Sequence, residues 1–578
     1  MNLPLPPDAG ATVATETTAE AYLALLADRG IDCLYVGAGT DTAPVIEAYA
    51  RAQSAGLRFP RPVLAAHENL AVGMAHGHTM VSRRPQAVML HVTVGAANAV
   101  CALINAARAQ VPMLFTAGRT PLYEQGPPGS RTHEVHWAQE MFDQGGMLRE
   151  IVKWDYELRG GLHVEQVVDR ALSVAMAEPR GPVYLTLPRE VLAERVPSVR
   201  LGGAYVQPTP PHPDPEAVQR LARALLAAER PVVAATSSGA DVRTVPLLAE
   251  LAERFGFGVV ENRPRYMGLP DAHPLHLGFE MPPVLAQADA LLFLETDVPW
   301  IPAVCAPRAD AFVAHAGTDP LYEAYPMRSF RSDLALTASP VGLLQALIAA
   351  CEALRGQDGA AARRARLQPL AQRWRDAAAA RAKADEDGGG PITKLFFSRC
   401  VDALRTPDTI VVNEYPGVRE QMRLTEPGTY FQLPSSGGLG WGLPAALGAK
   451  QAAPERPVIC LQGDGAYLFA NPAACHHAGA LHDLPVLTLV YNNQGWDAVE
   501  KAATGMHPRG HTARHAAAHG RAPLSSLAPL PAFEQYVQAS GGHGECVTER
   551  GQLMPALRRA WDVVTKEQRQ ALVNVIGA

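Results

Sequence analysis

The chain lacks the features that mark membrane proteins, nucleic-acid-binding proteins and secreted disulfide-rich proteins. Its longest apolar runs, such as residues 291–294, are of strand length and fall far short of the roughly 20 residues that a membrane helix needs. The formal net charge is only −6 over 578 residues, which implies no nucleic-acid partner. The N-terminal MNLPLPPDAG has no basic segment followed by an apolar one, so no secretory signal is expected.

The eight cysteines show no paired metal-binding spacing, and most lie in apolar stretches. This pattern favours buried, reduced thiols. We therefore expect a cytoplasmic protein that associates with neither a membrane nor nucleic acid.

The length and composition predict an ordinary globular protein of several domains. A chain of 578 residues with 48% hydrophobic and 19% charged residues is too long for a single core. The Pro-rich segment 207–215 (QPTPPHPDP) is typical of a linker, and an Ala/Arg-rich helical segment ends in three glycines near residue 390. We predict domains at 1–195, 205–350 and 391–578, with a helical linker at 351–390.

Short apolar strands alternate with helical segments throughout the chain. In the first two domains we expect strands at 33–36, 63–66, 87–90, 112–118, 181–187, 230–235 and 290–294. This alternation is typical of βαβ units, which form parallel sheets covered by helices. The predicted fold is therefore α/β, with three doubly wound parallel-sheet domains.

The segment Gly463–Gly495 contains the most informative motif. A buried strand at 457–461 leads into Gly-Asp-Gly, a helical stretch follows, and a second buried strand at 486–490 leads into Asn492-Asn493. The carboxyl ends of parallel strands form the ligand-binding edge of such sheets. Asp and Asn side chains supply the oxygen ligands that Mg²⁺ prefers, and a diphosphate bridged by that ion would lie against the helix N-terminus.

A lone Gly-Asp-Gly is equally consistent with a plain strand-to-helix turn. The 26 residues between Gly465 and Asn492 favour the functional interpretation, because the whole pattern resembles the metal–diphosphate motif of thiamine diphosphate enzymes. In addition, residues 65–121 are similar to the N-terminal domain of the thiamine diphosphate-dependent decarboxylase and acetolactate synthase superfamily. Nearly the whole chain shares this resemblance.

The branch that the chain most resembles is that of the benzoylformate decarboxylases. In that branch a histidine follows the catalytic glutamate by 23 positions, as His91 follows Glu68 here. The matches extend to Val412-Asn413-Glu414 and to the glycine-rich segment 437–444. The resemblance implies that the three domains are a pyrimidine-binding, a central and a diphosphate-binding domain.

The resemblance also implies roles for individual residues. Glu68 would hydrogen-bond the aminopyrimidine ring and activate the thiazolium carbon, which requires a shielded carboxylate with a raised pKa. Leu439 would be the apolar wedge that keeps the cofactor bent. The implied cofactor-binding residues are Glu68, Asn413, Glu414, Gly438, Leu439, Gly463, Asp464, Gly465, Ala466 and Asn493. The implied Mg²⁺ ligands are Asp464, Asn493 and the backbone carbonyl of Gly495.

His91 and Thr40 are the candidate catalytic residues on the substrate side. His91 would transfer a proton near the substrate, although it could instead only hydrogen-bond a backbone carbonyl. Thr40 lies where the family places a substrate-contacting serine, and Trp300 and the loop after Trp496 are further candidates for specificity. The segment 295–302 lacks the branch's second active-site histidine, which makes benzoylformate itself a doubtful substrate, and no FAD signature is present.

The function implied is a thiamine diphosphate- and Mg²⁺-dependent lyase or transferase. The expected reaction is non-oxidative decarboxylation of a 2-oxo acid through a carbanion–enamine intermediate. Acetolactate synthase-like carboligation and C–C cleavage of a diketone by a lyase or hydrolase are the enzymatic alternatives, and an inactive binding paralogue is the non-enzymatic one. We expect a homodimer or homotetramer with active sites between subunits. The Gly/His-rich segment 506–521 is expected to be a solvated loop near the active site.

Overall fold

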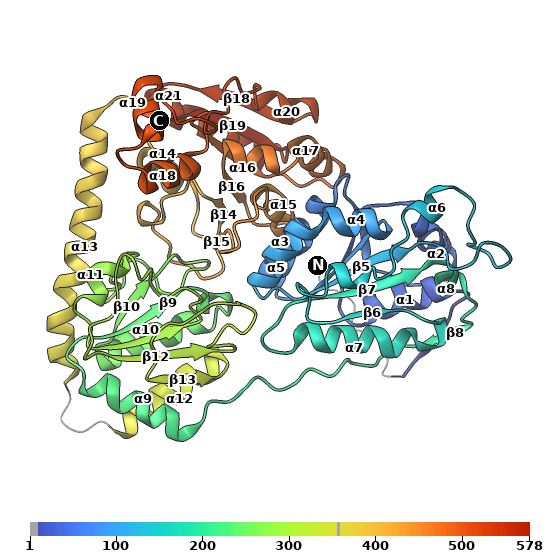
Figure 1. Cartoon of the computed structure of the whole chain (residues 1–578), viewed down its shortest axis with the longest axis horizontal. Coiled ribbons are helices and arrows are strands. Elements are labelled where there is room, and N and C mark those ends of the chain that lie inside the picture. Colours follow the sequence, from blue (N-terminus) through green and yellow to red (C-terminus); the bar gives the residue numbers. More distant parts are fainter. Residues whose placement is uncertain (1–9, 355–358) are drawn as a thin grey trace.

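The structure, a computed structural model, describes residues 10–354 and 359–578. It contains three parallel β-sheets, each flanked by helices (Figure 1), which confirms the predicted α/β fold. The N-terminal stretch in which no secretory signal is expected lies almost entirely outside the described residues, as do residues 355–358 of the predicted linker. Within the described residues, no helix is both long enough and apolar enough to cross a bilayer.

The first sheet has six strands in the order β3-β2-β4-β5-β7-β6. Its strands are β2 (Cys33–Val36), β3 (Arg61–Leu64), β4 (Gln86–Leu90), β5 (Met113–Arg119), β6 (Asp155–Glu157) and β7 (Pro182–Pro188). The flanking helices are α1 (Thr18–Asp28), α2 (Ala43–Ala55), α3 (Glu68–Ser82), α4 (Val92–Asn98), α5 (Val100–Arg108), α6 (Val135–Ala138), α7 (Val164–Met176) and α8 (Arg189–Ala193). A small antiparallel pair, β1 (Thr12–Ala14) and β8 (Ser198–Arg200), closes the unit.

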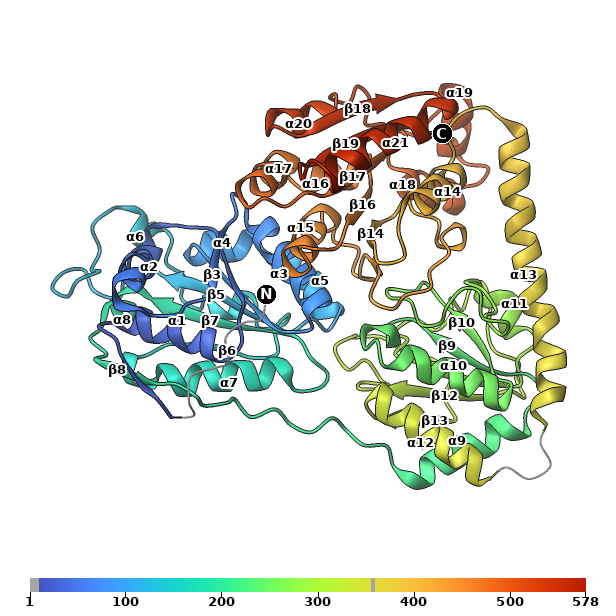
Figure 2. The same cartoon turned by 180° about the vertical axis from the view of Figure 1, so that it is seen from behind.

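The central sheet has five strands in the order β10-β9-β11-β12-β13. They are β9 (Pro231–Ala235), β10 (Gly258–Glu261), β11 (Ala290–Leu294), β12 (Phe312–Gly317) and β13 (Leu334–Thr337). The helices around it are α9 (Pro215–Ala227), α10 (Thr244–Phe255), α11 (Met281–Leu285) and α12 (Pro340–Ala353). Residues 201–214 cross from the first unit to α9 without regular structure (Figures 1 and 2), as the Pro-rich sequence predicts.

The third sheet has six strands in the order β15-β14-β16-β17-β19-β18. They are β14 (Ile410–Glu414), β15 (Tyr430–Gln432), β16 (Val458–Gly463), β17 (Leu487–Asn492), β18 (His543–Val547) and β19 (Ala571–Ile576). Its helices are α14 (Lys394–Leu404), α15 (Gly442–Ala452), α16 (Asp464–Phe469), α17 (Pro472–Leu481), α18 (Asp497–Met506), α19 (His511–His519), α20 (Glu534–Ala539) and α21 (Arg550–Thr565).

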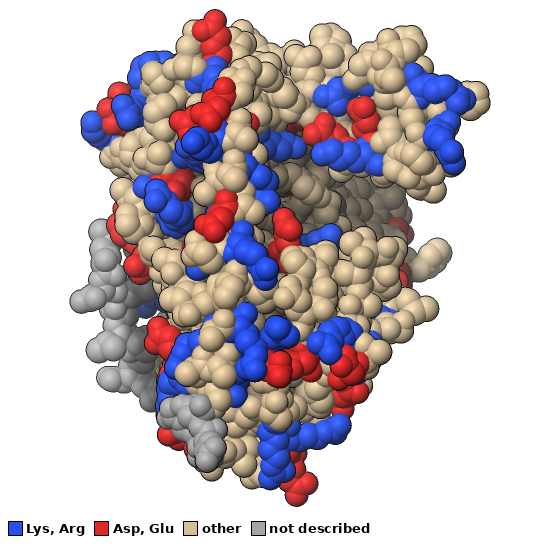
Figure 3. Space-filling view, turned by 90° about the vertical axis from the view of Figure 1, so that its left-hand side faces the viewer, with Lys and Arg blue, Asp and Glu red and all other residues tan. Residues whose placement is uncertain are grey.

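A 29-residue helix, α13 (Ala360–Gly388), runs along the outside of the molecule beside the central and third sheets (Figure 1). Positive and negative side chains on the face shown in Figure 3 are interspersed rather than separated by sign. Arg381 of α13 pairs with Glu420 of the third unit at 2.6 Å. Five of the eight cysteines are buried, and none of the eight, all of which the structure describes, forms a disulfide.

The first and third sheets are joined by close packing of α3 against α15, which lie side by side in Figures 1 and 2. A Cβ atom at Gly77 would lie 1.9 Å from the carbonyl oxygen of Ala445, and one at Gly448 would lie 1.9 Å from that of Met74. Only glycine permits so close an approach of two backbones. The same contact is part of a hydrophobic core that both units share.

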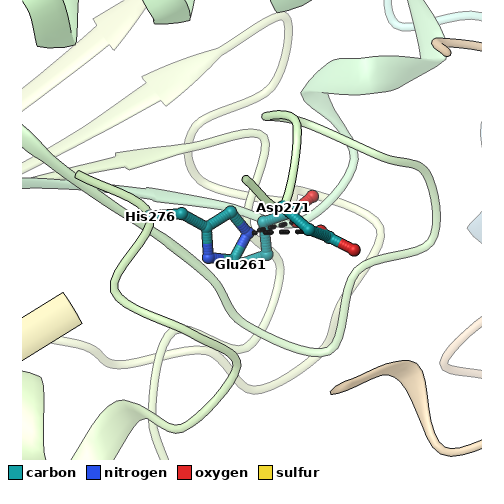
Figure 4. A group of neighbouring side chains, drawn as sticks. All are labelled: Glu261, Asp271 and His276. Atoms are coloured by element: carbon teal, nitrogen blue, oxygen red, sulfur yellow. Dashed lines mark hydrogen bonds and ion pairs between the residues drawn. The ribbon is translucent and has the colours of Figure 1, made fainter. Parts of the chain in front are cut away.

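Glu261, Asp271 and His276 of the central unit form a cluster (Figure 4), and Arg419 joins it to the third unit. His276 Nε2 lies 2.8 Å from Glu261 Oε2, and Asp271 lies beside them. Two carboxylates and an imidazole could bind a metal ion. However, Arg419 donates to both oxygens of Asp271 at 2.7 and 2.8 Å and lies 3.5 Å from Glu261 Oε2. The guanidinium already compensates the carboxylates, so we interpret the cluster as a buried contact between domains.

One secondary-structure prediction is wrong. The Gly/His-rich segment 506–521 is not a loop, because residues 511–519 form the helix α19. Four alanines in that segment favour a helix, and glycines 510 and 520 mark its two ends, the second in the left-handed conformation typical of a helix C-terminus. The prediction of a loop rests on the many glycines and histidines in the segment.

The tight contact between α3 and α15 can be tested with two Gly→Ala substitutions. Gly448→Ala should destabilise the protein by about 1–3 kcal/mol, because its methyl group must displace the backbone of α3. The control is Gly551→Ala in α21, where no atom lies within 4 Å of the added Cβ; it should be neutral or stabilising by up to about 1 kcal/mol. Chemical denaturation of both variants measures the difference, and equal stabilities would contradict the packing argument.

Candidate active site

The two halves of the Gly-Asp-Gly…Asn-Asn motif meet at the carboxyl ends of β16 and β17. Asp464 begins α16, and its Oδ1 accepts a hydrogen bond from the backbone N–H of Gly465 at 2.8 Å. Its Oδ2 accepts from the backbone N–H of Gly495 at 3.1 Å. Asp464 therefore holds the loop after β17 against the start of α16. Burial raises the pKa of this carboxyl group, which the backbone N–H donors partly offset.

The groups around Asp464 fit a hard divalent cation. The Asn493 side-chain N–H₂ donates to Asp497, which orients the amide and leaves its carbonyl oxygen as a possible ligand. The backbone carbonyl of Gly495 and the buried carboxylate of Asp464 are further oxygen donors. No atom lies within 4 Å of a Cβ built on Gly463, so there is open space at this point. Oxygen donors of this kind match Mg²⁺.

A second buried carboxylate lies at the end of the neighbouring strand, β14. Glu414 is fully buried and accepts hydrogen bonds from the backbone N–H groups of Gly440 and Gly442 at 2.8 and 2.7 Å, and from Gln462 Nε2 at 2.6 Å. Burial raises its pKa to about 7, although these donors act in the opposite direction. Glu414 thus fixes the turn that carries half-buried Leu439 into α15.

The side chain of Asn413 is enclosed by the protein and does not face open space. Its side chain is fully buried, accepts from the N–H of Gly417 at 2.9 Å, and donates to the Gly417 carbonyl, Tyr430 and Gln432. Its amide nitrogen and its amide oxygen both have partners within the protein. These contacts shape the turn after β14, and the contact with the cofactor that the resemblance implies stays a prediction. Ala466 is likewise buried, in the first turn of α16.

Asn105, which the sequence reasoning missed, connects the first unit to the glycine-rich turn. It lies on α5 and is 2% exposed. Its Nδ2 donates to the Gly438 carbonyl at 2.8 Å, and its Oδ1 accepts from the Gly438 N–H at 3.1 Å and from Ser436 at 2.7 Å. A single amide in the otherwise apolar stretch VCALINAA was the available signal.

Glu68 is the first residue of α3 and is partly exposed at the end of β3. Its Oε2 accepts a hydrogen bond from Asn98 Nδ2 at 2.6 Å. His67 caps the helix, because its Nδ1 accepts from the N–H of Asn69 at 3.2 Å, and it also lies 3.3 Å from Asn471 Nδ2 of the third unit. In the single chain, Glu68 is not yet shielded from water as its predicted role requires.

His91 lies at the end of β4 and pairs with Asp41, a second residue that sequence reasoning missed. His91 Nδ1 is 2.5 Å from Asp41 Oδ1, and Asp41 is 2% exposed. This hydrogen bond raises the pKa of the imidazole, as do the nearby Gln139 and the charge of Glu68. The partner of Nδ1 is therefore a carboxylate and not the backbone carbonyl that was the alternative. Val92 follows with φ of 33°, a strained value for a β-branched residue.

Thr40 and Trp300, the other candidates for substrate contact, have different surroundings. Thr40 is exposed and lines a small pocket together with Asp41 and His91. Trp300 is 6% exposed and packs against Phe293 and other aromatic rings in the core of the central unit. Trp300 is thus a core residue in this structure, and its role in specificity stays a prediction.

A cleft of about 400 Å³ lies between the first and central units. Arg83, Gln110 and Glu295 are among the residues that line it. None of the predicted site residues lines this cleft. The chemistry expected from the sequence belongs instead to the strand ends described above.

Two family models match the chain in the regions that carry these residues. Residues 16–147 match the thiamine pyrophosphate enzyme N-terminal TPP-binding domain, and residues 415–575 match the C-terminal TPP-binding domain. The chain belongs to the thiamine pyrophosphate enzyme family. Glu68 and His91 lie within the first matched region, and Leu439, Asp464 and Asn493 lie within the second.

Decarboxylases and acetolactate synthases are similar to this chain over most of their length. Benzoylformate decarboxylase of Pseudomonas aeruginosa is 27% identical over 502 residues, which are 84% of this chain and 87% of that protein. The acetolactate synthase isozyme 1 large subunit of Escherichia coli is 25% identical, over 86% of this chain and 84% of that protein. The crystal structure of benzoylformate decarboxylase from Polynucleobacter necessarius has the same fold, with a TM-score of 0.78 over 98% of this chain and 99% of that chain, at 20% identity.

The buried position of Glu414 predicts a pH-dependent effect of Glu414→Gln. The pKa of Glu414 is higher in the folded state than in the unfolded state. Glu414 therefore contributes most to stability below its unfolded-state pKa. This contribution is lost as the pH rises through about 7. Between pH 5 and pH 8 the stability of the wild type relative to Glu414→Gln should fall by about 3 kcal/mol. Urea denaturation at both pH values measures this fall. The control is Glu426→Gln, at an exposed carboxylate of the same unit, which should show no such change.

Proposed function

We propose that this member of the thiamine pyrophosphate enzyme family decarboxylates a 2-oxo acid with thiamine diphosphate and Mg²⁺. The observation that carries the proposal is the hydrogen bond from the Gly495 N–H to Asp464, which joins the two parts of the Gly-Asp-Gly…Asn-Asn motif. When bound, thiamine diphosphate supplies a carbon nucleophile and an electron sink for the bond that breaks. The similarity to benzoylformate decarboxylase supports the same reaction class.

The third unit would hold the diphosphate. Asp464, Asn493 and the Gly495 carbonyl would coordinate Mg²⁺, and the open space at Gly463 would admit the phosphate groups. Gly465 would keep the start of α16 close to Trp496, since a Cβ there would lie 2.2 Å from the indole ring. Leu439 would contact the cofactor from the turn that Glu414 and Asn105 hold in place.

The first unit would supply the proton-transfer groups. Glu68 would hold a proton at the pyrimidine ring nitrogen of the cofactor, and its hydrogen bond from Asn98 would orient the carboxylate. His91, whose raised pKa keeps it protonated to higher pH than a free histidine, would donate a proton to the substrate-derived carbon or oxygen. Asp41 would fix the orientation of that imidazole.

Two copies of the chain would complete each site. Large apolar side chains are exposed on the first unit, including Trp137 and Phe142, and on the third, including Phe469 and Leu481. Exposed apolar groups of this size favour a protein contact. A homodimer or homotetramer that covers them would also shield the partly exposed Glu68, as its role demands.

Carboligation is the second candidate reaction, because an acetolactate synthase subunit is nearly as similar as the decarboxylase. Product analysis separates the two: pyruvate and other 2-oxo acids should yield aldehydes if protonation follows CO₂ release, and hydroxyketones or acetolactate if a second carbonyl is captured. Release of acids from a cyclic diketone would instead indicate C–C hydrolysis.

Glu68→Gln tests the proposal. The variant should lose at least about 100-fold in turnover, because an amide cannot exchange the proton, whereas its affinity for thiamine diphosphate with Mg²⁺, measured by calorimetric titration, should change far less. Glu216→Gln, at an exposed position on α9, is the matched control and should behave as the wild type. Undiminished turnover by Glu68→Gln would refute the assignment, and a wild-type protein that binds no cofactor would indicate a non-catalytic paralogue.

A further inference from the structure

The backbone that follows β17 is supported by residues 521–527, which lie outside the Gly-Asp-Gly…Asn-Asn motif. The N–H of Trp496 donates to the Ser525 carbonyl at 2.8 Å, and the N–H of Leu527 donates to the Gln494 carbonyl at 2.9 Å. An isolated antiparallel bridge lies between these two hydrogen bonds. The predicted Mg²⁺ ligands after β17 belong to this supported loop, so its conformation decides where their oxygen atoms point.

Arg521, at the start of the supporting segment, packs directly against the loop. Its Nη2 donates to the backbone carbonyl of Asn493. A Cβ built on Gly495 would lie 2.3 Å from Arg521 Nη1, so the guanidinium lies against the backbone of that glycine. Arg521 Nη1 is also 3.5 Å from Asp497 Oδ1 and 3.4 Å from Glu500 Oε2. One side chain therefore joins the loop to α18.

Asp497, the first residue of α18, determines which way the amide of Asn493 points. Asp497 Oδ1 accepts a hydrogen bond from Asn493 Nδ2. A carboxylate can only accept, so the amide nitrogen faces Asp497 and the amide oxygen faces away from it. Asp497 Oδ2 lies 3.2 Å from Lys394 Nζ, at the start of α14. The carboxylate is thus fixed between two cations, Lys394 and Arg521.

These contacts affect the proposed metal site without adding a ligand to it. If the Asn493 amide turned over, an N–H₂ group would replace the oxygen, and Mg²⁺ binds oxygen ligands. Groups that hydrogen-bond a metal ligand typically change metal affinity by about 10- to 100-fold. The charge of Arg521 by itself repels a cation. Any benefit of Arg521 to metal binding must therefore come from the shape that it gives the loop.

We propose that Asp497 and Arg521 are positioning residues that set the affinity of the site for Mg²⁺. Asp497 sets which atom of the Asn493 amide faces the ion. Arg521 keeps the backbone of the loop, including the Gly495 carbonyl, in the conformation that binds the ion. The inference rests on the proposed Mg²⁺–diphosphate site, and it makes α18 and residues 521–527 part of that site.

The test measures the affinity of the metal-free full-length protein for Mn²⁺ in the presence of saturating thiamine diphosphate. Mn²⁺ prefers the same oxygen ligands as Mg²⁺, and its electron paramagnetic resonance signal reports the free ion. Asp497→Ala should weaken binding by about 10-fold or more, because the Asn493 amide can then rotate. Asp497→Asn should lose less, because the new side chain retains an oxygen that accepts the hydrogen bond. Loss of charge alone would weaken both variants equally.

Arg521→Met is the sharper test, because charge and position predict opposite results. If Arg521 acts only through its charge, its removal should tighten Mn²⁺ binding. A positioning role predicts that binding weakens by about 10-fold or more. Arg521→Lys should retain part of the affinity, because an ammonium group can still donate to the Asn493 carbonyl.

Asp562→Asn and Arg514→Met are matched controls at exposed positions. Asp562 pairs with Lys566 on α21, and Arg514 lies on α19. Both variants should bind Mn²⁺ as the wild type does. Melting temperatures without cofactor are measured in parallel. Solvent-accessible ion pairs contribute little to stability, so Asp497→Asn and Arg521→Lys should melt within about 4 °C of the wild type.

Unchanged or tighter Mn²⁺ binding by Asp497→Ala and Arg521→Met would overturn the proposal, as would equal losses in Asp497→Ala and Asp497→Asn. Asp464→Ala separates this inference from the proposed function, because it should abolish Mn²⁺ binding by removing a ligand. If Asp464→Ala loses the ion while the Asp497 and Arg521 variants keep it, the metal site is supported and the positioning role is wrong. A wild type that binds no Mn²⁺ with the cofactor would overturn both.

Discussion

The close packing of α3 against α15 is the constraint on which the candidate site depends. Glycines at positions 77 and 448 let the two helix backbones touch, and this contact fixes the first unit against the third within one chain. Glu68 is the first residue of α3, and the turn that carries Leu439 leads directly into α15. The helix contact therefore sets the positions of the residues proposed to activate and to bend the cofactor. Asn105 reinforces this arrangement by holding Gly438 from the opposite domain.

Buried charges at strand ends give the site its chemistry and make it costly to fold. Glu414 and Asp464 end or follow neighbouring strands, are almost completely buried, and have raised pKa values because burial disfavours their charged forms. Backbone N–H groups compensate each only in part. Carboxyl groups with shifted pKa values are typical of functional sites. Glu414 is satisfied within the chain and shapes a turn, whereas Asp464 retains capacity for a cation.

Local sequence patterns predicted the parts of the structure that depend on interactions between residues close together in the sequence. Apolar strands with glycine at their ends located β2 and β16, and an apolar run alone located β11. The 26-residue spacing placed Asp464 beside the loop after Asn493. Residues that act through tertiary contacts could not be found in this way. Asp41 and Asn105 appear as isolated polar residues, and only the fold reveals that they hold His91 and Gly438. Asn413 and Trp300 show the converse, since the fold buries both side chains, which the sequence alone does not reveal.

The affinity for thiamine diphosphate with and without Mg²⁺ tests the central claim most directly. The claim is that Asp464, with the loop it holds, forms a metal-dependent diphosphate site. Calorimetric titration of the wild type and of Asp464→Ala with the cofactor should show binding that requires Mg²⁺ in the wild type and is lost in the variant. Equal binding by both proteins, or binding by the wild type that is unaffected by removal of Mg²⁺, would contradict the account.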